Sequence, residues 1–126
     1  MQVSIAFTDR PITVAPPAFP LAQDSEVGAI VDFYGVVRSL ENGEPIPGLD
    51  YEAYLPMAEK ELRRICAELE KDHPCRSVSF LHRLGHVTTR EASLHVRVAA
   101  KHRAEAFAFA KLLIDRMKED VPIWKI

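Results

Sequence analysis

The sequence predicts one α+β domain, residues 1–126, with a mainly antiparallel sheet and two principal helices. Five segments show the two-residue alternation, or the β-branched and aromatic content, that is typical of strands. Two longer segments repeat apolar residues every three or four positions, as amphipathic helices do. Along the chain the order is strands, helix, strands, helix, which suits this fold class. We find no internal repeat and no low-complexity segment, and 126 residues are enough for one core.

The first expected strand lies at the N-terminus, where Val3, Ile5 and Phe7 alternate to one face of residues 1–14. Prolines interrupt the chain after it, and residues 21–27 could form a short helical turn. The second strand is expected at residues 28–38. Gly35 lies inside it and indicates a bulge or the close approach of another backbone. The other three strands are expected at residues 49–54, 78–84 and 92–99, with a turn-rich loop at 41–48 and a connection at 85–91.

Each expected helix carries one apolar stripe that should face the core. The first helix spans residues 57–71, with Pro56 suited to its first turn. The second follows the basic turn Lys101-His102-Arg103 and ends before Pro122, because a proline disfavours the helical conformation in the preceding residue. The stripes consist of Leu62, Ile65, Cys66 and Leu69 in the first helix, and of Phe107, Ala110, Ile114 and Met117, widened by Ala106, Phe109 and Leu113, in the second.

The overall charge of the chain excludes some classes of partner. The net charge is −2 and the pI is near 6.2, so nothing global attracts nucleic acid or an anionic membrane. Any anion site must therefore be a local cluster. No apolar run approaches the ~20 residues that a membrane helix needs, and the N-terminus lacks the basic and apolar regions of a signal peptide. We expect a cytoplasmic protein.

Neither the thiols nor the histidines indicate a chemical site. Cys66 and Cys75 form neither a CxxC pair nor a disulfide framework, so we expect Cys66 to be a buried hydrophobic residue and Cys75 a loop thiol. His82 and His86 are four residues apart, but Gly85 and the strand-like flanks argue against one helical face. No acidic or cysteine partner has ligand spacing, which argues against zinc. We expect no metal and no cofactor.

Other polar residues are also expected to be unremarkable. His95 lies between the inward-facing Leu94 and Val96 and is expected to be a solvated strand residue. Glu52 and Glu59 have no second carboxylate that the sequence places beside them. The chain has no glycine-rich phosphate loop of either common pattern.

The strongest candidate for chemistry is a set of basic side chains. His102 and Arg103 are expected in the first turn of the second helix, where free backbone N–H groups favour an anion. Lys118 is expected in its last turn and, taken alone, is better interpreted as a surface lysine that complements the helix dipole. Guanidinium groups match phosphate, and lysines crowded by other cations have a lowered pKa and become usable amines. The set that indicates an anion site consists of Arg38, His102, Arg103, Lys118 and Lys125.

Five ordered blocks of the sequence resemble the large, catalytic subunit of molybdopterin synthase. They are GAIVDFYGVVR, YEAYLPMAEKEL, VSFLHRLG, KHRAEAF and DRMKEDVPIWK, and together they span residues 28–125. The most specific motifs are H-R-x-x-A-F and K-x-x-x-P-x-W-K. The resemblance implies an α/β-hammerhead-like fold and a homodimer. Each copy would bind one small ubiquitin-like subunit with a C-terminal Gly-Gly thiocarboxylate, which makes a heterotetramer.

The same resemblance implies a sulfurtransferase of molybdenum cofactor biosynthesis, which puts two sulfurs onto cyclic pyranopterin monophosphate to give the dithiolene of molybdopterin. Because sulfur arrives on the partner, no cysteine of this chain is needed. Family members usually continue with a basic tail, so no substrate contact from such a tail is expected here. The implied catalytic residues are Lys118, which meets the partner's C-terminus, and Lys125, and the implied substrate-binding residues are Arg38, His102, Arg103, Lys118 and Lys125.

Two other functions would use part of this pattern. A non-catalytic module that binds a phosphorylated small molecule would need Arg38, His102 and Arg103, but not both lysines. A scaffold that only docks a ubiquitin-like protein would need an apolar surface, but not the His-Arg pair. The presence of all five basic residues favours the enzyme.

The length of the second helix leads to one more expectation. Arg103 and Lys118 are 15 residues apart, which is roughly 22 Å at ~1.5 Å per residue and too far for both to reach one small pterin. We therefore expect two copies of the chain to share each site, with His102 and Arg103 of one copy facing Lys118 and Lys125 of the other. Alternatively, His102 and Arg103 only bind a stray anion at the helix start.

Overall fold

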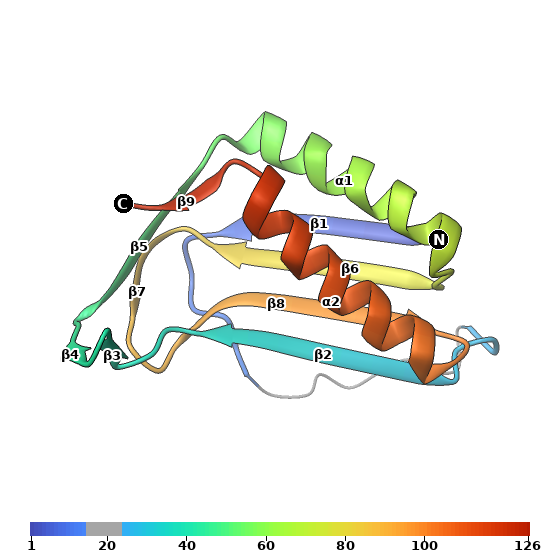
Figure 1. The fold of residues 1–126 in the computed structure, drawn as a ribbon, viewed down its shortest axis with the longest axis horizontal. Helices are drawn as coiled ribbons and strands as arrows, with labels where there is room; N and C mark the ends of the chain where they lie inside the picture. Colours follow the sequence, from blue (N-terminus) through green and yellow to red (C-terminus); the bar gives the residue numbers. More distant parts are fainter. Residues whose placement is uncertain (15–23) are drawn as a thin grey trace.

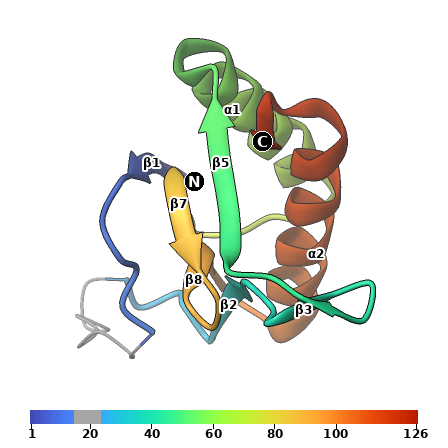
Figure 2. The same cartoon turned by 90° about the vertical axis from the view of Figure 1, so that its left-hand side faces the viewer.

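The protein is described here by a computed structural model that covers residues 1–14 and 24–126. Its main sheet has four strands in the order β1-β6-β8-β2, and both helices pack against one face of it (Figure 1). A smaller sheet, β7-β5-β9, lies across one end of the main sheet (Figure 2). The elements are β1 Gln2–Thr8, β2 Ala29–Val36, β3 Leu40–Glu41, β4 Glu44–Pro45, β5 Gly48–Ala53, α1 Leu55–Asp72, β6 Ser77–Arg83, β7 Gly85–Thr88, β8 Ala92–Ala100, α2 Arg103–Asp120 and β9 Ile123–Lys125.

The predicted α+β class is confirmed, and the main sheet is mainly antiparallel. Among the strands of the described residues, only β1 and β6 pair in parallel, while β8 pairs antiparallel with both β6 and β2. The first strand is shorter than predicted and ends at Thr8, although Ile12 still forms an isolated bridge with Ala92. Residues 24–27 form a turn, whereas the rest of the helical turn predicted at 21–27 lies outside the described residues.

The core lies between the two helices and the sheet. The stripe predicted for α1 is buried as expected, and Leu94, Val96 and Val98 of β8 face it. In α2 the buried stripe is rotated by about one residue from the prediction. Phe107 is 62% exposed, which makes its predicted place in the core wrong, and Ile114 is half-buried. The residues of α2 that are fully buried are Ala106, Phe109, Ala110, Leu113 and Met117.

The small sheet and the β3–β4 hairpin contain strands that the sequence analysis assigned to loops or to the tail. β7 has four residues, β9 has three, and β3 and β4 have two each. The central strand β5 pairs with β7 on one side and β9 on the other, so that Tyr51 lies opposite both Gly85 and Lys125. These pairings fix the C-terminal residues beside the end of the main sheet. No helix in the described part of the chain is long and apolar enough to cross a membrane.

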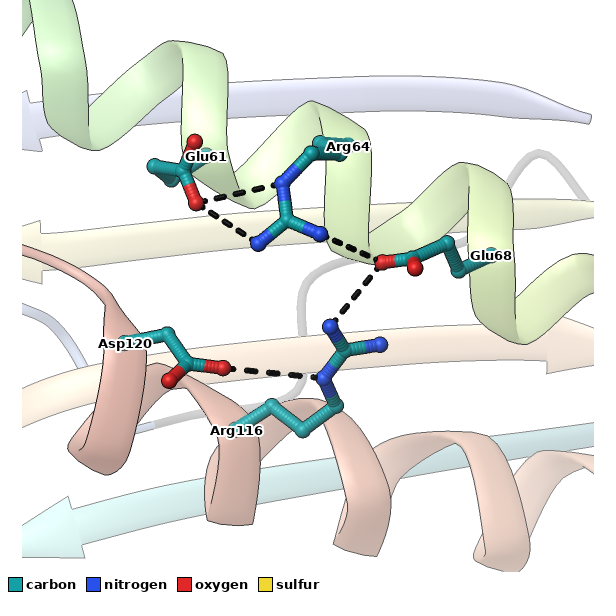
Figure 3. Close-up of polar contacts among 5 residues, drawn as sticks. All are labelled: Glu61, Arg64, Glu68, Arg116 and Asp120. Carbon is teal, nitrogen blue, oxygen red and sulfur yellow. Dashed lines mark hydrogen bonds and ion pairs between the residues drawn. The ribbon is translucent and has the colours of Figure 1, made fainter.

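Five charged side chains connect the outer surfaces of α1 and α2 (Figure 3). Glu68 Oε2 of α1 accepts hydrogen bonds from Arg64 Nη1 at 2.7 Å and from Arg116 Nη2 of α2 at 2.9 Å. Arg64 also donates to Glu61, and these bonds lower the pKa of the Glu61 carboxyl. Arg116 Nε lies 3.9 Å from Asp120 Oδ2. The network therefore joins the two helices by a bond through Glu68.

Replacing Arg116 by alanine is expected to lower the free energy of unfolding by about 0.5–1 kcal/mol, because the pair is partly exposed and screened. The loss should shrink as salt is raised from low to high concentration. Urea unfolding at two salt concentrations measures both effects. The control is Lys111→Ala, which removes an ion pair to Asp115 within α2 only. Equal losses in the two variants would show that the bond between the helices adds nothing.

Candidate active site

A cavity of about 470 Å³ lies at the end of the main sheet that is next to β5 and β9. Its walls come from the C-terminal part of α2, the adjacent ends of β2, β6 and β8, the β3–β4 hairpin, β5 and β9. Most of its lining is apolar. The apolar and aromatic lining residues are Phe33, Val36, Val37, Leu40, Ile46, Leu49, Tyr51, Leu94, Ile114, Met117, Ile123 and Trp124.

Three of the five predicted basic residues line this cavity, namely Arg38, Lys118 and Lys125. They come from three different parts of the chain: Arg38 follows β2, Lys118 lies in the last turn of α2, and Lys125 lies in β9. All three side chains are exposed, and among the described residues none of them has an ion-pair or hydrogen-bond partner. Three cations without neutralising partners at one apolar cavity are suited to hold an anion.

Local structure explains how each of the three cations reaches the cavity. The register of β2 against β8 shifts between Gly35 and Val36, which agrees with the bulge, one of the two alternatives predicted at Gly35, and Arg38 lies just beyond it. At the end of α2, Pro122 O accepts a hydrogen bond from Tyr54 N, which ties the chain after the helix to β5. The β9 strand then runs along β5 and places Lys125 opposite Tyr51.

His102 and Arg103 do not line the cavity. His102 is the N-cap of α2 and Arg103 is its first residue, at the end of the helix away from β9 (Figure 1). Both side chains are exposed, as predicted, and within the described part of the chain neither has a side-chain partner. A single chain therefore brings together three of the five predicted residues and leaves two about a helix length away.

His82 also lines the cavity, and the sequence analysis did not select it. It is 3% exposed, its ring centre is 5.0 Å from that of Tyr51, and its Nδ1 is 2.8 Å from the Arg83 carbonyl oxygen. Burial lowers the pKa of His82, although the hydrogen bond to Arg83 opposes this shift. The alternation in the predicted strand 78–84 contained the signal, because it places His82 on the same face as Val78 and Phe80.

The prediction that His95 is solvated is wrong. Its Nε2 lies 2.7 Å from Asp32 Oδ1, its ring stacks on Tyr34 at 4.4 Å, and its side chain is only 16% exposed. Arg97 also donates to Asp32. Burial alone would raise the pKa of Asp32, but the hydrogen bonds from Arg97 and His95 outweigh burial and lower it. The acidic partner on the neighbouring strand β2 is what holds His95 at the surface of the sheet.

No group of three or more His, Cys, Asp or Glu residues is placed to hold a metal ion within residues 1–14 and 24–126. His82 and His86 differ in their surroundings, since His82 is buried and His86 is exposed, with its Nδ1 3.1 Å from Asp50 Oδ1. Glu59 pairs with Arg63 and is not part of the cavity. Glu41 is the acidic residue of the cavity lining.

The two cysteines are buried, and burial raises the pKa of each thiol to about 11. This confirms the prediction that Cys66 is a buried hydrophobic residue and shows that Cys75 is buried in its loop. At neutral pH both thiols are protonated, so neither is an activated nucleophile.

Alkylation of the native protein with iodoacetamide should therefore be much slower than that of a free cysteine at pH 8, and its rate should still rise above pH 9. Unfolding in urea should bring the rate of both thiols to that of free cysteine. Mass spectrometry of the alkylated peptides measures each site. Rapid labelling of native Cys75 at pH 7 would contradict the high pKa.

The fold and the cavity together define a small α+β protein in which three exposed cations line one largely apolar cavity. The sequence model of the MoaE protein family matches residues 7–120. The molybdopterin synthase catalytic subunit of Bos taurus is 44% identical over 98 residues, or 78% of this chain and 52% of its own length. That of Nostoc is 37% identical over 126 residues, or 99% of this chain and 76% of its own length.

The crystal structure of molybdopterin synthase from Staphylococcus aureus superposes with a TM-score of 0.82 at 34% identity, covering 94% of this chain and 86% of that chain. The chain belongs to the MoaE family. It spans about half the length of the mammalian relatives that it matches.

Proposed function

We propose that this protein is the catalytic subunit of molybdopterin synthase, a sulfurtransferase that converts cyclic pyranopterin monophosphate into molybdopterin. Three cations without partners at one apolar cavity, in a chain of the MoaE family, are the observation that carries this proposal. The apolar walls would receive the ring system of the pterin, while the cations would hold its phosphate. The sulfur would arrive on a small ubiquitin-like subunit, so no cysteine of this chain takes part.

Each basic residue has a role in this reaction. Arg38 would hold the substrate phosphate with its guanidinium, whereas Lys118 would meet the thiocarboxylate at the partner's C-terminus. Lys125 would hold the substrate from strand β9. Attack by the thiocarboxylate sulfur creates negative charge on oxygen, and positioned cations in a partly desolvated cavity stabilise such charge. Both lysines are therefore the proposed catalytic residues.

The proposed assembly is a homodimer with one small subunit on each copy, a heterotetramer. Its two-fold interface would bring His102 and Arg103 of one copy to the cavity of the other, where they complete the phosphate site. The support for this arrangement is the separation of the two groups along α2 and the exposure of all five basic side chains.

The decisive experiment mixes this chain with a thiocarboxylated small subunit and cyclic pyranopterin monophosphate, and assays for dithiolene product. The expected result is product that depends on the thiocarboxylate. Binding of the pterin phosphate without product would indicate a non-catalytic binding module. Binding of the small subunit, with neither binding of the pterin phosphate nor formation of product, would indicate a scaffold.

The cavity should accept only a partner whose C-terminus is Gly-Gly. Gly35 has no side chain, so another backbone can approach this wall closely; a Cβ there would lie in ordinary van der Waals contact, 3.4 Å from Leu94 Cβ and 3.5 Å from Phe33. Partners that end in Ala-Ala or Leu-Gly should bind about tenfold more weakly or worse, since an extra methyl group in a full site costs about 1–3 kcal/mol. Titration calorimetry with the three partners measures this. Equal affinities would mean that the C-terminus does not enter a narrow channel.

A further inference from the structure

His82 lies deeper in the cavity than the three cations. The cations are exposed, whereas His82 is 3% exposed and lies near the end of β6, one of the two inner strands of the main sheet. A ligand that touches both must therefore extend inward from the mouth. The proposed function places the pterin ring against apolar walls and assigns no hydrogen-bonding residue to this inner end of the cavity.

The hydrogen bond of His82 to the backbone determines which ring nitrogen carries the proton. Nδ1 lies 2.8 Å from the Arg83 carbonyl oxygen, and a carbonyl oxygen can only accept a hydrogen bond, so Nδ1 must donate. In the neutral ring, Nε2 then has a lone pair and acts as an acceptor. Among the described residues Nε2 has no hydrogen-bond partner.

Tyr51 links the position of His82 to that of Lys125. The His82 ring packs edge-on against Tyr51, and Tyr51 lies directly opposite Lys125 in the β5–β9 pair. Directly opposite residues have Cβ atoms about 5 Å apart, so the three side chains form a row on the order of 10 Å long. That length suits a fused ring system with an anionic group at one end.

We propose that His82 is a substrate-recognition residue, whose Nε2 accepts a hydrogen bond from a ring N–H of the ligand while Arg38 and Lys125 hold its anionic group. The cavity then has two ends of different chemistry. The outer end binds negative charge, and the inner end selects a heterocycle that presents a donor, as a reduced pterin does. This inference rests on the proposed function, because that function supplies the ligand.

The test compares two ligands in the complex of the chain with a small subunit that ends in an ordinary Gly-Gly carboxylate, so that no turnover occurs. The ligands are cyclic pyranopterin monophosphate, kept anaerobic, and inorganic phosphate. The variant is His82→Asn, because the asparagine amide can still donate to the Arg83 carbonyl but does not reach the position of Nε2. His86→Asn is the matched control, since His86 is exposed and does not line the cavity.

We expect His82→Asn to raise the Kd for the pterin phosphate about tenfold, as the loss of one hydrogen bond does. Its Kd for inorganic phosphate should not change, and His86→Asn should match the wild type for both ligands. In the wild type, the ¹⁵N resonance of His82 Nε2 should shift when the pterin phosphate is added but not when phosphate is added. This second measurement needs no variant and does not depend on how His82→Asn folds.

The outcomes separate this inference from the function on which it rests. If the wild type binds the pterin phosphate but the Nε2 resonance stays in place and the Kd of His82→Asn is unchanged, His82 has no part in recognition and the proposed function stands. An equal loss for both ligands would also overturn the inference, because it would show a general collapse of the cavity. If the wild-type complex does not bind the pterin phosphate, the proposed function itself is wrong.

Discussion

Replacing Lys118 by alanine is expected to reduce product formation by about 10²–10³-fold, the loss typical when one group that stabilises an oxyanion is removed. The protein should stay folded. Lys118 is exposed and without a side-chain partner in the described part of the chain, so the change in the free energy of unfolding should be within about 0.5 kcal/mol. The product assay and urea unfolding measure the two effects separately.

Lys111→Ala is the matched control for this variant, since Lys111 is an exposed lysine of the same helix that does not line the cavity. Its activity should equal that of the wild type. Turnover near the wild-type rate in Lys118→Ala would remove Lys118 from the catalytic site and leave it as an ordinary surface lysine at the end of α2.

Mixing Arg103→Ala chains with Lys118→Ala chains should restore activity that neither variant has alone. In each variant homodimer both shared sites would lack one cation. In a mixed dimer one site lacks both cations, but the other combines the intact Arg103 of one copy with the intact Lys118 of the other. With random exchange half of the dimers are mixed, so about a quarter of all sites should work.

The control for this experiment is a mixture of Lys118→Ala and Lys125→Ala chains. Both lysines would come to each site from the same copy, so every site in the mixed dimer still lacks one of them. This mixture should not recover. If the Arg103→Ala and Lys118→Ala mixture also stays inactive after subunit exchange has been confirmed, the sites are not shared between copies.

Periodic patterns in the sequence predicted the long elements of this fold. Both helices and all five predicted strands are present, because each is long enough to repeat an apolar face. The strands β3, β4, β7 and β9 have two to four residues and cannot show a period. Their pairing depends on neighbours such as β5, which lies between β7 and β9. Tertiary contacts, which a local pattern does not contain, place these strands.

The candidate site was predictable in kind but not in full. The sequence indicated the basic residues, and the resemblance assigned roles to them. The sequence grouped Arg38 with Lys118 and Lys125, but it did not contain the pairing of the short strand β9 with β5, which brings Lys125 to the same cavity. The predicted core position of Phe107 was wrong because two apolar stripes that are one residue apart have the same spacing along α2. Only packing against the sheet and α1 selects one of them.

The strand order of the main sheet has a consequence for folding during synthesis on the ribosome. Strand β1 pairs with β6, 75 positions later from Gln2 to Ser77, and β2 pairs with β8, which is made later still. The first two strands therefore emerge with unpaired edges and no partner in the sheet. Pairings between distant segments form slowly, and exposed edges favour aggregation during synthesis. We expect that the nascent chain needs most of its length before it becomes resistant to protease.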